Sequence, residues 1–469
     1  MSKKLTTYRQ SNIFVPNSAT CIMKSKLVVK NFGPIKEVSL DLRNVNVFIG
    51  PQATGKSALA KIFTIFKAPR KFFYKTDSDT NKKIIDNEKA SKQFADVFSE
   101  YNISSFLNTQ TEIEFESELH LITYKNGVLN YEPKLLDQIN YLEILFVDFD
   151  KNKTEIATKF SEFSGKFLVF DIKASRLLYE KDLPTILDKN NYVSASENKS
   201  KEILEVIREI EEHLSTSTAI YIPAERNLVN IIKKAALNLM VNSVPIPKHI
   251  LSFGAELEKI TLNEIKLDFI QKELVYKIID GEDKVYINAD NIISLNEAAS
   301  GIQSVVPLLA SVLSEQTIYH RSFVIEEAEL NLFPLAQYEL IKLLEARRTD
   351  PRSRWEDYGT IHTYTTHSPY ILSSLNNLLY AFKVRMKLFD KLNDSSDATP
   401  SKNMQEATER VQKIVKATIN PENFTAYQIC DGSARSIFNN ETGLIEDNYI
   451  DLATDKINDD FEQLMELTK

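Results

Sequence analysis

Cysteine is almost absent from this sequence, in which only Cys21 and Cys430 occur among 469 residues. Two cysteines cannot form a disulfide scaffold, and they cannot supply a cysteine-rich zinc site or a Cys-x-x-Cys hook. This scarcity is typical of proteins that work in the reducing cytosol. We therefore expect a cytoplasmic protein that is stabilised by a hydrophobic core.

Long apolar runs are also missing. No stretch approaches the roughly 20 apolar residues that a membrane span requires, and the lysine-containing N-terminus has no continuous apolar region of signal-peptide length. Basic charge is not in excess, because 57 Lys and Arg stand against 65 Asp and Glu, for a net charge of -8. These absences argue against a membrane protein and against a protein that coats nucleic acid with its whole surface, so any such contact would need a local basic patch.

The composition is that of an ordinary globular protein, with 43% hydrophobic and 26% charged residues. The length is compatible with about three domains, or with one large domain that carries insertions. From the pattern along the chain we expect an N-terminal extension (residues 1–25), an N-terminal lobe (26–131), a mostly helical insertion (132–215), a C-terminal lobe (216–390), a linker (391–404) and a C-terminal cap (405–469).

Hydrophobic periodicity predicts the fold class. Residues 26–49 predict strands, and the last of them, VNVFI, is a continuous apolar run typical of a buried parallel strand. Residues 111–131 predict an antiparallel meander with a hairpin turn at Asn126-Gly127, whereas residues 197–214 predict a charged amphipathic helix. The result is an α/β protein with a mixed sheet, an antiparallel β subdomain, a helical insertion and a small C-terminal α+β cap.

Residues 50–57, GPQATGKS, match the phosphate-loop pattern G-x-x-x-x-G-K-[ST] at every fixed position, between a predicted strand and a predicted helix. The glycines let the backbone wrap closely around a phosphate, and the N–H groups direct positive partial charge toward it. Lys56 can reach the β- and γ-phosphates, and Ser57 can bind Mg²⁺. The alternative is a glycine turn without a ligand. The predicted nucleotide-binding residues are Gly50, Ala53, Thr54, Gly55, Lys56 and Ser57.

Two acids follow a second buried strand, in the segment FVIEE at residues 323–327. Ligands of open α/β sheets bind at the carboxyl ends of the strands, where these acids lie. We expect Glu326 to approach Mg²⁺ and Glu327 to hold and polarise the attacking water. Side chains alternate along a strand, so the two acids need not serve one ligand. The alternative is a solvated acidic loop.

Two further segments carry candidate residues. His367 ends the strand after the acids, where an imidazole can contact the γ-phosphate, although a lone histidine is more often structural. In ASGIQ, at residues 299–303, Ser300 is a candidate N-cap and Gly301 opens a helix that can present N–H groups to an anion. The alternative is simply a capped helix. Pro307 predicts a kink or an early break in that helix.

Taken in order, these segments resemble the ATP-binding-cassette ATPases of the SMC, RecF and OLD kind. KLVVKNFGPIKEVSLDL is similar to their opening hairpin, GPQATGKS to Walker A, ASGIQS to a diverged signature motif, FVIEEAELNLFP to Walker B with its D-loop, and THSPYIL to the switch-histidine segment. YIPAERN resembles a further segment of the OLD-like branch. The resemblance covers most of residues 26–385 and implies an ABC-type P-loop ATPase head.

The resemblance also implies a mechanism. Two heads would sandwich ATP and Mg²⁺, with Lys56 and Ser57 from one protomer facing Ser300 and Gly301 of its partner. ATP would hold the homodimer, or a higher homo-oligomer, together, and hydrolysis would release it. Glu327 would be the catalytic base and His367 the γ-phosphate sensor. Gln303, in the signature segment, joins the predicted nucleotide-binding residues.

Some residues depart from the family pattern. Glu326 stands where many cassette ATPases have Asp, and the signature lacks the second glycine of LSGGQ. A glutamine that contacts Mg²⁺ is expected after Walker A; Gln110 is the candidate, and a surface glutamine is the alternative reading. These departures predict slow hydrolysis.

The sequence has neither long coiled-coil arms nor the strand-borne acids of a C-terminal TOPRIM nuclease, so we expect no nuclease domain in it. What remains resembles the ATPase subunits of bacterial antiphage systems such as Septu and PARIS. That resemblance implies an ATPase switch that controls a separate effector, a nuclease or a toxin. The alternatives are a RecF-like ATPase of DNA repair or maintenance and a non-hydrolysing scaffold that ATP stabilises.

Two basic segments are candidate nucleic-acid contacts. KAPRKFFYK, at residues 67–75, interleaves cations with aromatic rings, which suits a phosphate backbone or single strands. RRTDPRSRW, at residues 347–355, is a second basic segment. The alternative for the first is a basic helix end whose aromatic side chains lie in the core.

Overall fold

The computed structural model describes residues 24–67, 74–76, 83–85, 87–117, 120–132, 134, 152, 155, 219–260, 262, 264–314, 322–348, 361–395, 398–446 and 449–467. The predicted N-terminal extension, apart from its last residues, and nearly all of the predicted insertion, with its charged helix, lie outside these residues. Within them, the prediction of an α/β fold with a mixed sheet is confirmed.

A six-stranded sheet forms the centre of the molecule, in the order β17-β16-β3-β15-β14-β9. Its strands are β3 (Val45–Ile49), β9 (Ala219–Ile222), β14 (Ser322–Glu326), β15 (His362–Thr366), β16 (Phe424–Cys430) and β17 (Ser433–Ser436). All pairs are parallel except β16 with β17. Every residue of β3, β14 and β15 is buried, as expected of parallel strands with covered faces. The carboxyl ends of these three strands therefore meet at one edge.

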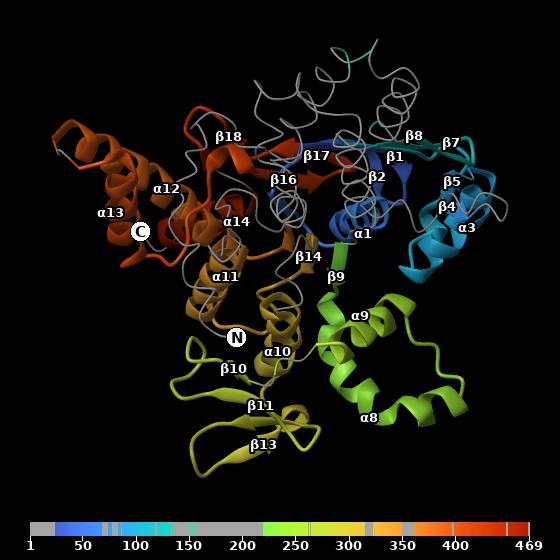
Figure 1. The fold of residues 1–469 in the computed structure, drawn as a ribbon, viewed down its shortest axis with the longest axis horizontal. Coiled ribbons are helices and arrows are strands. Elements are labelled where there is room, and N and C mark those ends of the chain that lie inside the picture. The colour runs from blue at the N-terminus through green and yellow to red at the C-terminus, as the bar shows by residue number, and fades with distance from the viewer. Residues whose placement is uncertain are drawn as a thin grey trace.

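A second, antiparallel sheet has the order β2-β1-β6-β7-β8. It comprises β1 (Ser25–Phe32), β2 (Ile35–Leu42), β6 (Glu112–Ser117), β7 (Leu121–Lys125) and β8 (Val128–Glu132), so the predicted hairpin and meander are confirmed. Asn126 and Gly127 both have positive φ, as a two-residue hairpin turn requires. Helix α1 (Lys56–Phe66) lies between the two sheets, because its buried residues share one core with Phe115 of β6 and Phe48 of β3. This arrangement is visible in Figure 1.

Three helices cover the other face of the central sheet: α10 (Ser300–Leu313), α11 (Pro334–Arg348) and α12 (Pro369–Ser395). Side chains alternate as the strand period requires, so Ile325 packs with these helices while Val324 faces α1. A buried network ties α11 to β15. Glu345 accepts hydrogen bonds from Arg348 Nε at 2.6 Å and Tyr364 Oη at 2.7 Å, and lies 3.0 Å from His362 Nδ1.

The remaining described elements surround this three-layer body (Figure 1). A four-stranded antiparallel sheet contains β10 (Glu264–Lys266), β11 (Val275–Ile279), β12 (Glu282–Tyr286) and β13 (Ile292–Ser294). The helices and short strands are α3 (Asn87–Glu100), α8 (Leu228–Val241), α9 (Lys248–Glu258), β4 (Tyr74–Thr76), β5 (Lys83–Ile85), β18 (Phe438–Asn439) and β19 (Leu444–Ile445). Short 3-10 turns are η1 (Ser104–Phe106), η5 (Ala224–Asn227), η6 (Leu295–Glu297) and η8 (Pro421–Asn423). Among the described residues, no helix is both long and apolar enough to cross a membrane.

The prediction of a loop over residues 391–404 was wrong for most of its length. α12 continues to Ser395, and α13 (Pro400–Gln412) begins five residues later. The polar residues of this segment do not interrupt the helices, because they lie on exposed helix surface or bond to one another. Asn403 Nδ2 donates to Asn393 Oδ1 at 2.8 Å across the turn, and Pro400 occupies a first-turn position that tolerates proline.

The C-terminal segment is an α+β unit, as predicted, but it is not simply appended. β16 pairs in parallel with β3, with Tyr427 opposite Phe48, and so belongs to the central sheet. Strand order depends on contacts between residues nearly 380 positions apart, which local sequence does not reveal. Helix α14 (Tyr449–Glu466) follows this unit.

The prediction of an early break at Pro307 was also wrong, because α10 is continuous from Ser300 to Leu313. A proline at position 307 cannot donate to the carbonyl of Gln303, four residues earlier. Asn230 of α8 replaces the missing donor, since its Nδ2 lies 3.2 Å from that carbonyl oxygen. Tertiary packing therefore compensates for the proline.

Candidate functional site

The phosphate-loop motif connects β3 to α1, in the expected strand–loop–helix order. The loop needs glycine at position 50 because a Cβ there would lie 2.1 Å from the Ile429 carbonyl oxygen of β16. Gly55, at φ +100, ends the loop, and a Cβ there would come within 2.9 Å of Ile35. Ala53 takes a positive φ of 60°, a conformation that non-glycine residues rarely adopt. This local strain marks the loop as a candidate binding site.

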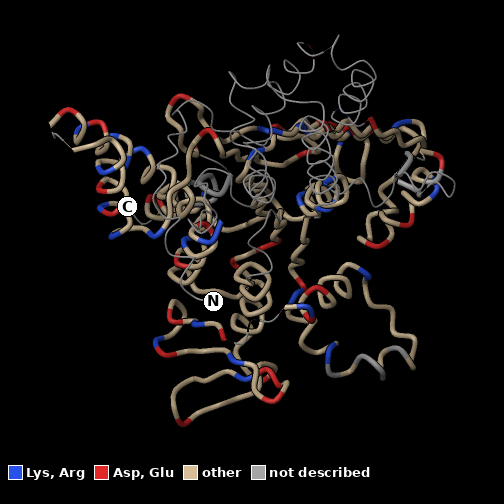
Figure 2. Tube along the Cα trace, in the orientation of Figure 1, with Lys and Arg blue, Asp and Glu red and all other residues tan. Residues whose placement is uncertain are grey.

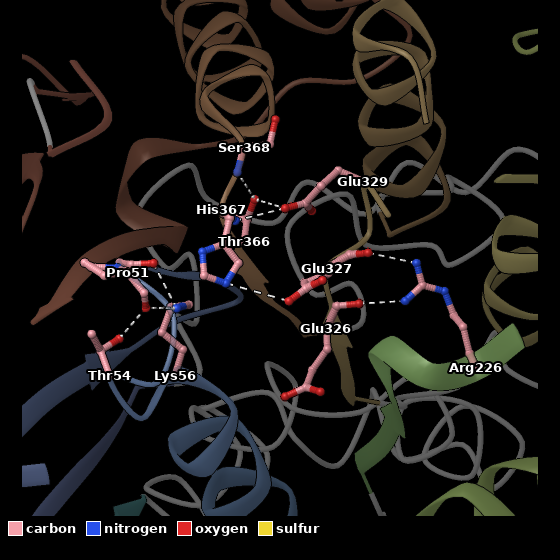
Figure 3. A network of polar contacts seen from close by, with 11 residues as sticks. Pro51, Thr54, Lys56, Arg226, Glu326, Glu327, Glu329, Thr366, His367 and Ser368 are labelled. Atoms are coloured by element: carbon pink, nitrogen blue, oxygen red, sulfur yellow. Dashed lines mark hydrogen bonds and ion pairs between the residues drawn. The ribbon is translucent and has the colours of Figure 1, made fainter. Parts of the chain in front are cut away.

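Lys56 is buried and folds back over its own loop. Its Nζ donates to the carbonyl oxygens of Gly50 at 2.9 Å and Pro51 at 2.6 Å (Figure 3). Burial lowers the pKa of Lys56 to about 8, and Glu327 and Glu326 oppose the shift. A cation held beside the loop amides is the arrangement that a polyphosphate requires.

Glu326 ends β14 and points toward α1. It is 4% exposed, and its Oε1 has no hydrogen-bond partner among the described residues. Burial raises the pKa of Glu326, whereas the hydroxyl of Tyr221, the ammonium of Lys61 and the hydroxyl of Ser57 oppose the shift. Glu326 and Ser57 are therefore close together. An unpaired carboxylate oxygen beside a hydroxyl fits Mg²⁺, which takes few protein oxygens and completes its shell with phosphate and water.

Glu327 follows the strand with a positive φ of 43°, and its N–H donates to the Thr365 carbonyl at 2.9 Å. Its side chain lies on the other side of β14 from that of Glu326 (Figure 3). The Oε1 of Glu327 is 3.7 Å from His367 Nε2, and both side chains are about one-third exposed, at 34% and 29%. The two acids thus occupy different positions, which supports separate roles for them.

His367 follows β15 and is held by Glu329, a residue that the sequence analysis did not single out. Glu329 Oε1 accepts hydrogen bonds from the His367 N–H at 2.9 Å and from Thr366 Oγ1 at 2.6 Å. Burial and the nearby Lys56 lower the pKa of His367, and the Gly50 carbonyl opposes the shift. The neutral imidazole therefore lies between the phosphate loop and Glu327.

Arg226 is a second residue that sequence reasoning missed. It lies in η5 within the segment YIPAERN and is 0% exposed. Among the described residues, its guanidinium donates to backbone carbonyls. Nη1 donates to the Glu326 carbonyl at 2.7 Å, and Nη2 donates to the Glu327 carbonyl at 2.8 Å (Figure 3). Burial lowers the pKa of Arg226 to about 10, and Glu329 opposes the shift most strongly. Arg226 thus positions the backbone that carries both acids.

The candidate signature segment lies at the start of α10. The N-cap is Ala299, so Ser300 is one residue inside the helix rather than its cap. Gly301 has a packing role, because a Cβ there would lie 2.5 Å from the Asn331 carbonyl oxygen of the loop after Glu327. Gln303 Nε2 donates to the carbonyls of Asn296 at 3.0 Å and Ala298 at 2.7 Å, so this amide orders its own loop.

The residues of the site come from two groups in the single chain. Gly50–Ser57, Glu326, Glu327 and His367 gather at one sheet edge, whereas Ser300 and Gly301 adjoin the loop after Glu327. Ser300 is exposed, and the amides of Ser300 and Gly301 make no hydrogen bond among the described residues. The Ser300 amide therefore lies at the exposed start of α10, whereas Gly301 is buried.

A family model described as an AAA ATPase domain matches residues 23–372. The chain belongs to this AAA ATPase domain family. No curated protein sequence matches it. Among solved structures, it is similar to the Smc head domain of Pyrococcus furiosus with an extended coiled coil bound to the C-terminal domain of ScpA, at 10% identity and a TM-score of 0.33, over 96% of this chain and 100% of that one. It is also similar to the SMC head domain of Thermotoga maritima, at 10% identity and a TM-score of 0.32, over 88% and 98%.

Gln110 is not brought to the phosphate loop of this AAA ATPase domain by any described contact. It is exposed in the turn before β6, where its carbonyl accepts a hydrogen bond from Asn31 Nδ2 at 3.1 Å. Its side chain makes no hydrogen bond among the described residues. The surface-glutamine reading accounts for this position.

Most of each candidate nucleic-acid segment lies outside the described residues. Arg70, Lys71, Phe72 and Phe73 lie outside the described residues, as does all of the second segment after Arg348. Arg347 donates to carbonyls at the end of α10, and Arg348 is buried against Glu345. These two arginines therefore stabilise the fold. Figure 2 shows acidic and basic residues interspersed along most of the described elements.

Proposed function

We propose that this AAA ATPase domain protein binds ATP with Mg²⁺ and hydrolyses the ATP slowly to ADP and phosphate. The observation that carries the proposal is the convergence of Lys56, Ser57, Glu326, Glu327 and His367 at the carboxyl ends of three adjacent parallel strands. Each group has the chemistry that phosphoryl transfer to water needs, namely a phosphate-binding cation, metal ligands, a base and a neutral donor.

The roles follow from the geometry. Ser57 and the unpaired oxygen of Glu326 would hold Mg²⁺, which neutralises phosphate charge when bound. Glu327 is partly exposed and would orient the attacking water, taking its proton on Oε1. His367, whose pKa is lowered, would donate a hydrogen bond from its neutral ring to the γ-phosphate. The loop amides and Lys56 would hold the remaining phosphate oxygens.

We further propose that two copies assemble face to face, with Ser300 and Gly301 of one copy closing on the nucleotide of the other. The unbonded amide of the exposed Ser300 supports this assignment. So does the exposed apolar surface next to them, because Phe333 is 79% exposed and Leu335 is 65% exposed immediately after the loop that Gly301 contacts. Burial of such a surface against a second copy would be favourable.

Subunit mixing tests both proposals. Lys56→Ala removes the phosphate cation, and Ser300→Arg obstructs the signature segment, so each variant alone should lack ATPase activity. Mixed in equal amounts, half of the dimers contain one of each and keep one intact composite site, so activity should return, to at most roughly a quarter of the wild-type value. Failure of mixing to restore activity would exclude the composite site, and wild-type turnover by Lys56→Ala would exclude the phosphate loop.

Glu327→Gln separates binding from hydrolysis. The amide cannot accept the proton of water, so this variant should bind ATP normally, lose turnover by roughly 100-fold or more, and accumulate as a dimer. Fluorescent-nucleotide titration, phosphate release and light scattering measure the three properties. Hydrolysis equal to that of the wild type would remove Glu327 from its assigned role.

We propose, finally, that the ATP-driven dimer or higher oligomer controls a separate effector, a nuclease or toxin of antiphage defence. The motif series supports this role, and helix α14 supplies a surface for it. Ile457, Phe461 and Leu464 are each at least 62% exposed and recur at helical spacing, flanked by the acids Asp459 and Glu462. Such a helix suits an apolar groove with a basic rim on another protein.

The product of a neighbouring reading frame is the partner to test. A paired Ile457→Asp and Phe461→Asp variant should lose co-purification with it, whereas Lys456→Gln on the same helix should retain it, and both should dimerise with ATP. Undiminished co-purification of the double variant would exclude α14 as the contact.

DNA-stimulated hydrolysis by the isolated protein would instead favour the alternative, a DNA-maintenance ATPase of the RecF kind. The scaffold alternative would be favoured if the wild type assembled with ATP but did not hydrolyse it, and if Glu327→Gln left that assembly unchanged.

A further inference from the structure

Two side chains from one short segment hold the first turn of α10. Arg226 Nε donates to the Ser304 carbonyl at 2.9 Å, and Asn230 Nδ2 donates to the Gln303 carbonyl at 3.2 Å. These carbonyls lie about one turn beyond Ser300 and Gly301, at the end of the helix that would face a neighbouring copy. Side-chain donors on successive helical carbonyls are unusual, because those carbonyls normally bond within the helix.

Pro307 explains why the Gln303 carbonyl is open to an outside donor. The proline has no N–H for this carbonyl, which therefore lacks its usual partner within the helix. Asn230 then supplies the only hydrogen bond that this carbonyl accepts from a side chain among the described residues. The proline thus lets Asn230 bind α10 directly beside the Ser304 carbonyl that Arg226 binds.

The same guanidinium also holds the catalytic end of β14. Arg226 donates to the carbonyls of Glu326 at 2.7 Å and Glu327 at 2.8 Å, as well as to Ser304. Since Arg226 is fully buried, a carbonyl that moved away would leave part of a charged group unpaired in the interior. Displacement of α10 without displacement of the two acids is therefore energetically opposed.

We propose that Arg226 and Asn230 are positioning residues that couple the signature end of α10 to Glu326 and Glu327 of the same subunit. The inference rests on the proposed composite site. Engagement of Ser300 and Gly301 with the nucleotide of the partner shifts α10, and the shared hydrogen bonds transmit that shift to the acids that act on the subunit's own nucleotide. The two ATP sites of a dimer are then linked, and hydrolysis is cooperative in ATP.

The alternative is that Arg226 merely stabilises the fold. Three variants of the full-length protein distinguish the two. Asn230→Ala removes one hydrogen bond from α10, and Arg226→Lys keeps the charge but cannot reach three directions at once. Asn238→Ala, an exposed residue on the same helix, is the matched control. The measurements are hydrolysis rate against ATP concentration, MgATP affinity with the fluorescent nucleotide, and the melting temperature.

Coupling predicts a specific pattern. The wild type and Asn238→Ala should show a Hill coefficient above one. Asn230→Ala should move that coefficient toward one and lower kcat about five-fold, the effect of one hydrogen bond, while MgATP affinity stays within about two-fold. Arg226→Lys should lower kcat by more than ten-fold, with the same unchanged affinity.

Other outcomes overturn the proposal. A kcat and Hill coefficient in Asn230→Ala equal to those of Asn238→Ala would exclude the coupling while leaving the ATPase assignment intact. A loss of activity that only parallels a fall in melting temperature, with cooperativity unchanged, would reduce both residues to fold stability. Absence of turnover and of ATP-dependent assembly in the wild type would overturn the proposed function itself, and the coupling with it.

Discussion

At the scale of single residues, the phosphate loop was predictable and its supporting contacts were not. Gly50, Lys56 and Ser57 lie within eight consecutive positions, so the local sequence pattern is enough to identify them as phosphate-binding residues. Glu329 and Arg226 act on residues 38 and 100 or more positions away in the chain, at distances that only a folded structure brings together. A third acid in EEAEL and the arginine of the YIPAERN segment were the only signals for them.

Lys56 gives the site a pH dependence. Burial lowers the pKa of Lys56 to about 8 in the free protein, and bound phosphates would raise it. Because the protonated amine binds phosphate, ATP affinity should be constant below pH 7. It should fall as the pH rises through 8, by at most ten-fold per pH unit. Titrations with the fluorescent nucleotide between pH 6.5 and 9.5 check this. Lys56→Arg, if it binds ATP, should show no such fall, and a flat wild-type profile would contradict the assignment of Lys56.

At the scale of elements, the sequence predicted strands and helices better than their limits. β3 and β14 were predictable because each is a short, mainly apolar run followed by polar functional residues. β15 is HTYTT, and its β-branched and aromatic residues favour a strand. The end of α12 and the continuity of α10 were not predictable. Asn393 and Pro307 each suggest that a helix is interrupted when the neighbouring side chains are unknown. In α10 the Asn230 amide supplies the hydrogen bond that Pro307 cannot, and in α12 the Asn393 side chain accepts a hydrogen bond from Asn403 of the next helix.

The buried network that joins α11 to β15 should be a major source of stability. Burial alone would raise the pKa of Glu345, but Arg348 and His362 lower it to about 2. Glu345→Ala leaves Arg348 buried without its partner and should cost about 3–5 kcal/mol of the free energy of unfolding. Denaturant unfolding at pH 7 measures this loss, and the exposed Glu406→Ala is the control, with little change expected.

The same network predicts how stability changes with pH. Because the folded pKa of Glu345 is depressed, its contribution is present above the ordinary value of 4.5 and is lost as the pH falls from 4.5 toward 2. The difference in stability between the wild type and Glu345→Ala should therefore shrink over that interval. A difference that stays constant down to pH 3 would mean that Glu345 is not the titrating group.

At the scale of the whole molecule, the exposed apolar surface beside α11 predicts assembly. Phe333→Asp places a charge where a second copy would cover the ring, so ATP-dependent dimerisation of the Glu327→Gln protein should weaken at least ten-fold. The melting temperature of the isolated subunit should not change, because Phe333 is 79% exposed. Ile414→Asp, at a position 80% exposed on another surface, is the control. Sedimentation measures the fraction of dimer. If both substitutions weakened dimerisation equally, Phe333 would not be part of the interface.

The placement of β16 beside β3 has a consequence for biosynthesis. The backbone of Gly50 rests against the carbonyl of Ile429, so one wall of the phosphate loop is built from residues translated nearly 380 positions later. A nascent chain that has not yet released β16 from the ribosome has an open sheet edge where that wall belongs. Nucleotide capture should therefore begin only after β16 has been synthesised and paired, which keeps chains that still lack this strand out of the ATP-dependent assembly.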